Sequence, residues 1–251
     1  MTVYCCPVSR AHKRLFSQKE LRKKMNPTDF VDINEQGLVH FDNERYMEAV
    51  QCFRAALARL NAQRQGLERA TEPDQNLTNF EVYPIPLEFP NLQETTVSPD
   101  GQFSIFDVAI LFEFADIVRD YPFIVGAILY NLALTLHVDA LQSHSPVKLW
   151  QAKEVYRKAL DFLQENKRAT LRATQSGDRR VLFLALANNY GHCCSYLSDR
   201  MGVERSEMLL GIILSDSITS EILTPKEFDR LRMSCMMGLM KKTLPPVAAA
   251  A

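Results

Sequence analysis

Residues 37–57 read GLVHFDNERYMEAVQCFRAAL, and the order of small, aromatic and polar residues in this stretch decides the fold. Apolar and small residues recur at helical spacing before and after the polar break at 42–44. The pattern therefore predicts two antiparallel helices, at about 30–41 and 44–61, joined by a short turn.

The side chains at the predicted crossing of these two helices explain how they fit together. Gly37 and Ala49 carry almost no side chain, so the helices can approach closely there. Phe53 fills the space beside the crossing, and Ala56 leaves room for the first helix of a following pair. Larger residues at Gly37 or Ala49 would overpack the contact.

This arrangement closely resembles a tetratricopeptide repeat, in Gly37-x11-Ala49-x3-Phe53-x2-Ala56-Leu57. A second copy reads Ala152-x3-Tyr156-x2-Ala159-Leu160, and its first helix is longer, with seven extra residues between Ala133 and Ala152. A third, weaker copy has Gly191 at the small site, but its second helix lacks the Ala and aromatic signature. No copy has the closing Pro of the family pattern. The predicted packing residues are Gly37, Ala49, Phe53, Ala56, Ala133, Ala152, Tyr156, Ala159 and Gly191.

The resemblance implies an all-α fold, a right-handed superhelix of antiparallel helix pairs. The long pairs and the inserted Pro-rich segment also resemble the expanded tetratricopeptide-like proteins that are abundant in diatoms. Repeats are expected at about 31–60, 125–163 and 180–216 within a helical domain spanning 29–243. Further helices are predicted at about 122–142, 146–165, 179–199, 203–216 and 225–241, the last as an amphipathic capping helix, followed by a frayed tail at 244–251.

A Pro-rich insert at about 71–118 interrupts the helical pattern. Residues 95–106 predict strand, turn and strand, because Pro99 presets φ for a turn and Gly101 supplies a positive φ. Residues 103–114 are apolar on both alternating faces, which favours a buried strand leading into a helix near 115, although an all-helical interpretation of 104–119 stays open. The insert is therefore expected to be β-hairpin-like.

The family resemblance further implies a concave groove, lined by the first helix of each pair, that binds a peptide or helix of another protein. Asn side chains suit such a groove, because their amides can both donate to and accept from an extended backbone. An alternative is that Asn131 and Asn188 stiffen their own repeats. The groove lacks the Lys and Arg with which the chaperone-binding subclass clamps a carboxylate. The predicted groove residues are Asn34, Leu38, Phe41, Tyr130, Leu134, His137, Asn188, His192 and Ser195.

Residues 1–28 form a basic arm that carries seven Lys or Arg residues. Cys5 and Cys6 before this basic run suggest an alternative function, a peripheral membrane protein with two acylated cysteines and a polybasic patch. A nuclear localisation segment at 19–24 and a solvated tail are the other interpretations, and the arm lacks aromatic residues interleaved for base stacking. Membrane contact is expected through this arm only, and nucleic-acid binding is not expected.

Composition and motifs favour a binding protein over an enzyme. The chain has 251 residues and a formal net charge of −1, which gives no overall attraction to nucleic acid or anionic membrane. The charge-poor stretch 121–138 is better explained as a buried helix than as a membrane span. Six Cys residues without framework spacing indicate reduced thiols and a cytoplasmic location, with a nuclear or membrane-peripheral one open. The sequence has no Gly-rich phosphate loop, nucleophile elbow or zinc-binding helix, so no catalytic, cofactor or metal site is predicted.

Overall fold

The computed structural model describes the helical body of the chain and parts of the insert. The described residues are 29–69, 81–86, 97–99, 101–106, 108–113, 117–166, 177–214, 229 and 231. The predicted basic arm, the tail and most of the predicted capping helix lie outside these residues.

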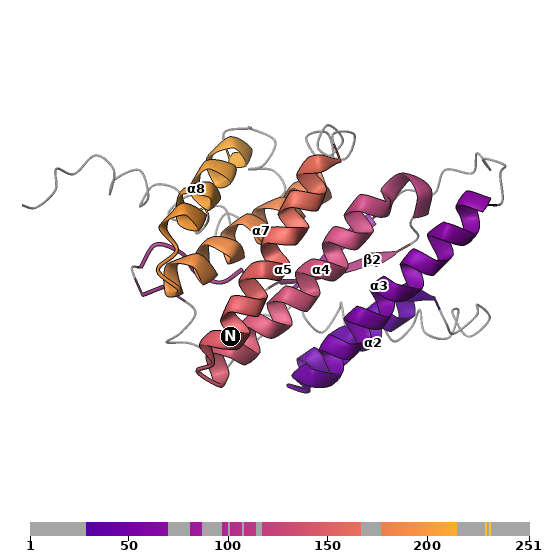
Figure 1. Ribbon diagram of the computed structural model, residues 1–251, viewed down its shortest axis with the longest axis horizontal. Helices are drawn as coiled ribbons and strands as arrows, with labels where there is room; N and C mark the ends of the chain where they lie inside the picture. The colour runs from indigo at the N-terminus through magenta and orange to yellow at the C-terminus, as the bar shows by residue number, and fades with distance from the viewer. Residues whose placement is uncertain are drawn as a thin grey trace, which may run out of the picture.

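Six helices form three consecutive pairs within the described residues (Figure 1). Within each pair, two antiparallel helices pack on one another, and the first helix of the next pair packs on the second helix of the pair before it. The described part is predominantly helical, which confirms the expected all-α class. The pairs are α2 (Phe30–Asp42) with α3 (Tyr46–Arg69), α4 (Ile117–Gln142) with α5 (Pro146–Glu165), and α7 (Gly177–Tyr196) with α8 (Arg200–Leu214).

The three turns inside the pairs have the same backbone conformation. Each contains one non-glycine residue with positive φ: Glu44 at 56°, His144 at 49° and Ser198 at 55°. The residue after it donates its N–H to the carbonyl five residues earlier, over 2.8–2.9 Å, which is the six-to-one bond of a Schellman helix end. Repetition of this turn gives a register for comparing the pairs that does not depend on side chains.

In this register, the position seven residues before each positive-φ residue holds Gly37, His137 and Gly191. A Cβ on Gly37 would lie 2.7 Å from Cε1 of Phe53, so this glycine permits the close crossing of α2 and α3. Gly191 is equally confined, because a Cβ there would lie 2.5 Å from Cε1 of Phe103. The sequence comparison had aligned Ala133 with Gly37, but the turn register aligns His137 instead. The extra length of the second pair therefore extends the start of α4.

Local signals explain where several helices begin. Ser145 is the N-cap of α5, with its Oγ 3.4 Å from the N–H of Lys148 and Pro146 at the first helical position, as predicted. Asp199 has the same role for α8, because its Oδ1 accepts the N–H of Gly202 at 3.0 Å. As a result α8 begins at Arg200, three residues before its predicted start. Helix α3 also runs farther than expected, to Arg69.

Two strands of the insert, β1 (Glu81–Pro86) and β2 (Val108–Glu113), pair antiparallel, with Pro84 opposite Ile110 and Pro86 opposite Val108. The backbone of Ile110 is hydrogen-bonded on its helix side, so Ile110 and Pro84 form a non-hydrogen-bonded pair. The nitrogens of both prolines therefore face the outer edge of the ribbon, where proline removes the N–H that an added strand would need.

A tight turn lies between β1 and β2 in the sequence, at residues 98–103. The N–H of Ser98 donates to the carbonyl of Phe103 at 2.7 Å, and Val97 and Ser104 form an isolated bridge. Gly101 has a φ of 70°, the conformation for which the sequence predicted glycine at this position.

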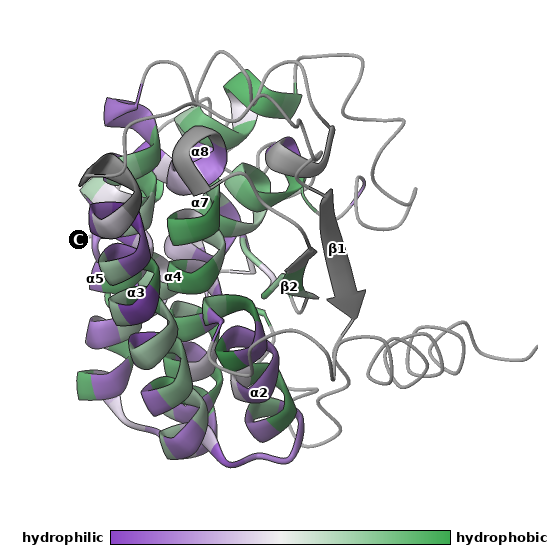
Figure 2. Cartoon of the chain, turned by 90° about the vertical axis from the view of Figure 1, so that its right-hand side faces the viewer, coloured by the Kyte–Doolittle hydropathy of each residue, from purple (hydrophilic) through white to green (hydrophobic). Residues whose placement is uncertain are grey.

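Apart from α8, which packs on α7, the described helices and strands form three layers (Figure 2). The second helices α3 and α5 lie on one side, the first helices α2, α4 and α7 in the middle, and the ribbon on the other side. Helix α4 is central, and its stretch Asp120–Gln142 is the one described segment long and apolar enough to span a membrane. Since 89% of its most apolar window is buried inside the protein, the core accounts for its composition.

Candidate functional site: the inner face of the helix array

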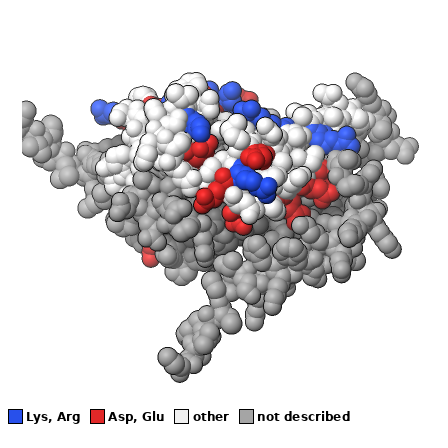
Figure 3. Space-filling model, turned by 90° about the horizontal axis from the view of Figure 1, so that it is seen from below, with Lys and Arg blue, Asp and Glu red and all other residues white. Residues whose placement is uncertain are grey.

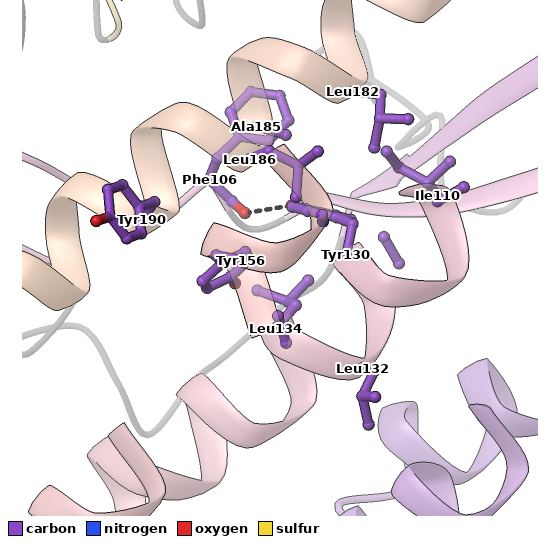
Figure 4. Close-up of a cluster of buried hydrophobic side chains, with 14 of the residues drawn as sticks. Phe106, Ile110, Tyr130, Leu132, Leu134, Tyr156, Leu182, Ala185, Leu186 and Tyr190 are labelled. Atoms are coloured by element: carbon purple, nitrogen blue, oxygen red, sulfur yellow. Dashed lines mark hydrogen bonds between the residues drawn. The ribbon is translucent and has the colours of Figure 1, made fainter. Parts of the chain in front are cut away.

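The inner face is the side of α2, α4 and α7 that faces the ribbon. An extended stretch of the insert, the inner segment (residues 101–106 and 108–113), lies across it. Its apolar side chains pack into the face, as Phe106 and Ile110 do beside Tyr130 in Figure 4. Phe103, Ile105, Phe106, Ala109, Ile110 and Leu111 are all 5% exposed or less.

Two asparagines hold the backbone of the inner segment at both its donor and its acceptor. The Oδ1 of Asn131, on α4, accepts the N–H of Ile110 at 2.9 Å, and its Nδ2 donates to the carbonyl of the same residue at 2.7 Å. Asn189, on α7, pairs in the same way with Phe106, at 2.7 and 3.0 Å. Each asparagine thus acts as one residue of a neighbouring strand would, and we call these two contacts the asparagine clamps.

Single hydrogen bonds complete the attachment. The Nδ2 of Asn188 donates to the carbonyl of Ser104 at 2.7 Å, and the hydroxyl of Tyr130 donates to the carbonyl of Phe106 at 3.0 Å (Figure 4). The inner segment has no described strand partner on the side that faces the helices. Side chains of the helices therefore satisfy its N–H and carbonyl groups there.

The inner segment covers the face on which the sequence placed the partner-binding groove. Seven of the nine predicted groove residues are at most 4% exposed, Leu38 is 9% exposed and Ser195 is half-buried. Asn188 and Tyr130 contact the segment directly, whereas His137 and His192 contact each other. The structure therefore places Asn188 and Tyr130 under the inner segment and the two histidines between α4 and α7.

The two histidines form a buried pair between α4 and α7. Nε2 of His137 lies 2.9 Å from Nδ1 of His192, so one of these nitrogens carries the proton and the other accepts it. Burial, and then the neighbouring His192, lower the pKa of His137 well below its ordinary value. The ring of Tyr156 meets His137 edge-on, with centroids 5.9 Å apart. Both histidines are fully buried and belong to the core.

Asn189 and the backbone of the inner segment were not among the predicted site residues. A signal was present in the sequence, because Asn131, Asn188 and Asn189 interrupt helices that are otherwise apolar on nearly every side. A buried amide needs partners, but periodicity does not identify a partner 83 residues away.

Two of the described cysteines, Cys193 and Cys194, are buried between the helices. Burial raises the pKa of Cys193 well above its usual range and raises that of Cys194 to about 12. Thiols held in the neutral form are poor nucleophiles and poor metal ligands. Among the described residues, no group of three or more His, Cys, Asp or Glu side chains is placed to hold a metal ion.

Apolar side chains are exposed at one repeated position on the outside of the array. Three residues after each positive-φ turn residue, the second helix carries Met47, Val147 or Met201, with 61%, 65% and 74% of the residue exposed. We call these three residues the outer row. They lie at equivalent places near the starts of α3, α5 and α8, where burial in the core does not explain an apolar side chain.

The second helices also expose Trp150, Met208 and Ile212, and they carry charges of both signs. Arg157 on α5 pairs with Glu154 and Asp161, and Arg205 on α8 reaches the same Asp161 at 2.6 Å. Figure 3 shows acidic and basic side chains interspersed with uncharged ones over the described part of one face. Such a surface gives no single-sign field for nucleic acid.

Comparisons of the chain with protein-family models, with curated proteins and with solved structures found no match.

Proposed function

We propose that this chain is a non-catalytic adaptor, built as a tetratricopeptide-like repeat array, that binds another protein. The shared turn conformation supports a repeat, as do the equivalent glycines Gly37 and Gly191. Ala49, Phe53 and Ala56 are fully buried, as the packing logic of such a repeat requires.

The outer row is the observation that carries the binding function. A soluble fold gains nothing from exposed methionine and valine, and single exposed apolar residues are ordinary. Recurrence at one structural position, however, gives each of the three pairs an exposed apolar side chain at the same place. A repeated apolar position of this kind suits a protein–protein contact, and methionine adapts well to a partner surface.

The inner face is a weaker candidate for a freely accessible site. Burial of each large apolar side chain contributes about 1.5–3 kcal/mol, so the inner segment is held by roughly as much free energy as stabilises a whole domain. A partner that contacts the chain in its resting state is therefore expected to bind outside, along the outer row.

Site-specific photo-crosslinking tests this function. A benzophenone side chain at position 147 or 201 should crosslink one defined partner protein, whereas the same group at exposed Lys158 should not. The triple variant Met47→Ser, Val147→Ser, Met201→Ser should lose the partner while its free energy of unfolding changes by less than about 0.5 kcal/mol for each substitution. Unchanged partner binding by the folded triple variant would exclude the outer row.

Asn188→Ala combined with His137→Ala does not test partner contact cleanly. Both side chains are buried, at 1% and 0% exposure, and both hold the inner face together. Lost binding in that variant would reflect a destabilised fold as readily as a missing contact.

A membrane-associated function is the alternative, through acylation of Cys5 and Cys6 in the basic arm. These residues lie outside the described part of the chain, so the proposal rests on the sequence alone. A Cys5→Ser, Cys6→Ser variant should move from the membrane pellet to the soluble fraction. An unchanged distribution would remove this alternative.

A further inference from the structure

The outer edge of β1 is the side of the ribbon on which a further strand would add. The opposite side, along β2, is satisfied by α4, because Asn131 bonds both the N–H and the carbonyl of Ile110. Among the described strands, none pairs with β1 on its outer side. An unpaired strand edge presents backbone donors and acceptors in a row, and a second chain can add its own strand there.

Every second residue of β1 directs its backbone groups toward this outer edge. Pro84 belongs to a non-hydrogen-bonded pair of the ladder, and the alternation of an antiparallel ladder gives Val82 and Pro86 the same orientation. Tyr83 and Ile85 have the opposite orientation, with their N–H groups directed at β2. Since proline has no N–H, Val82 is the one residue among these three outward-facing positions that offers a donor.

We infer that Pro84 and Pro86 close this edge to strand addition and so keep copies of this chain from joining through β1. A second copy is the partner that the prolines exclude, because two identical edges can pair antiparallel about a two-fold axis. Pairing centred on position 84 needs donors at positions 82, 84 and 86 of both chains, and the prolines remove two of these three donors from each. The inference concerns the ribbon and not the outer row, so it goes beyond the adaptor function proposed above.

Restoring the missing N–H groups in the full chain tests this inference. The variant Pro84→Val, Pro86→Val should self-associate, with a dissociation constant lower than that of the unmodified chain by roughly tenfold or more in sedimentation equilibrium. In the associated form, the amides introduced at positions 84 and 86 should be protected from hydrogen exchange.

The matched control is the variant Tyr83→Val, Ile85→Val. It places the same number of valines in β1, but at positions whose N–H groups already face β2. Its sedimentation should therefore match that of the unmodified chain. A folded proline-to-valine variant that sediments like the unmodified chain would overturn the inference, and so would equal self-association of the variant and its control.

Single prolines introduced into β1 test the direction of the edge without relying on self-association, and they decide the matter if the double variant unfolds. Each is compared with alanine at the same position, so that the difference reports the lost N–H. Val82→Pro should unfold at nearly the same urea concentration as Val82→Ala, because its N–H faces outward. Tyr83→Pro should unfold at a clearly lower urea concentration than Tyr83→Ala, because it loses a bond to β2. Equal losses at the two positions would overturn the inference. No readout here involves the outer row, so failure of this inference and failure of the proposed function are distinguishable.

Discussion

At the scale of single residues, the fold depends on polar side chains placed where apolar ones would be expected. Asn131 is 2% exposed in the middle of a helix that is apolar nearly all round, a position that would be costly without partners. Its amide offsets that cost by satisfying two backbone groups of Ile110 that are buried with it. Asn189 does the same for Phe106.

Replacing Asn131 with Ala should therefore be strongly destabilising. Both backbone groups of Ile110 lose their partner, and each unsatisfied buried group costs about 1–3 kcal/mol. Urea unfolding should show a loss of roughly 2–5 kcal/mol. Asn43→Ala is a suitable control, because the exposed Asn43 amide bonds only the carbonyl of Val39, and we expect a loss below about 1 kcal/mol. Equal effects of the two substitutions would contradict the clamp.

His137 predicts how stability depends on pH. Its pKa is lowered in the folded chain, whereas the unfolded chain titrates near the ordinary value of 6.5. Below that pH the unfolded chain binds more protons than the folded chain. The contribution of His137 to the free energy of unfolding is therefore complete above pH 6.5 and is lost as the pH falls. The limiting slope is about 1.4 kcal/mol per pH unit for one imidazole. Urea unfolding at several pH values between 7 and 5 should show that the free energy of unfolding falls less with decreasing pH in His137→Leu than in the unmodified chain. An unchanged pH dependence would refute this role.

At the scale of elements, the fit between paired helices depends on glycine at the crossing. Gly37→Ala places a Cβ against the ring of the fully buried Phe53, and overpacking of this kind costs about 1–3 kcal/mol. Gly66→Ala is the matched control in the neighbouring helix, because no atom lies within 4 Å of the added Cβ. Alanine should there stabilise the helix by about 0.5–1 kcal/mol. The melting temperature should fall for Gly37→Ala and rise for Gly66→Ala. A shift in the same direction for both variants would contradict a close α2–α3 contact at Gly37.

The sequence predicted the helices best where local signals mark their ends. The sequence predicted the turn at 42–44 and the N-terminus of α5 at Ser145-Pro146, because a few neighbouring residues determine caps and turns. The sequence pattern aligned Ala133 with Gly37, whereas the turn register aligns His137. A helix that is apolar on all sides has no polar face from which the equivalent position could be identified.

The contacts of the inner segment were beyond sequence reasoning for a different reason. They join residues 21 to 84 positions apart, and no local pattern encodes which helix a strand will cross. Two of the predicted groove residues, Asn188 and Tyr130, do contact the inner segment, but the sequence did not indicate that this segment would lie there.

At the scale of the whole molecule, the three layers contribute different features to the structure. The middle layer supplies much of the core, the ribbon covers the inner face with Pro84 and Pro86 in its first strand, and the second helices of the pairs expose Met47, Val147 and Met201. An array whose inner face is filled by its own chain buries more apolar surface than an open one would.

The inner segment lies across the first helices, and an NMR contact tests this placement most directly. Phe103 and Gly191 are far apart in sequence, yet a Cβ on Gly191 would lie 2.5 Å from the Phe103 ring. With ring-labelled phenylalanine, we expect a nuclear Overhauser effect between Phe103 ring protons and the Gly191 α protons. The equivalent contact between Phe53 and Gly37 is the internal reference. A signal for Phe53 and Gly37 without one for Phe103 and Gly191 would contradict the account.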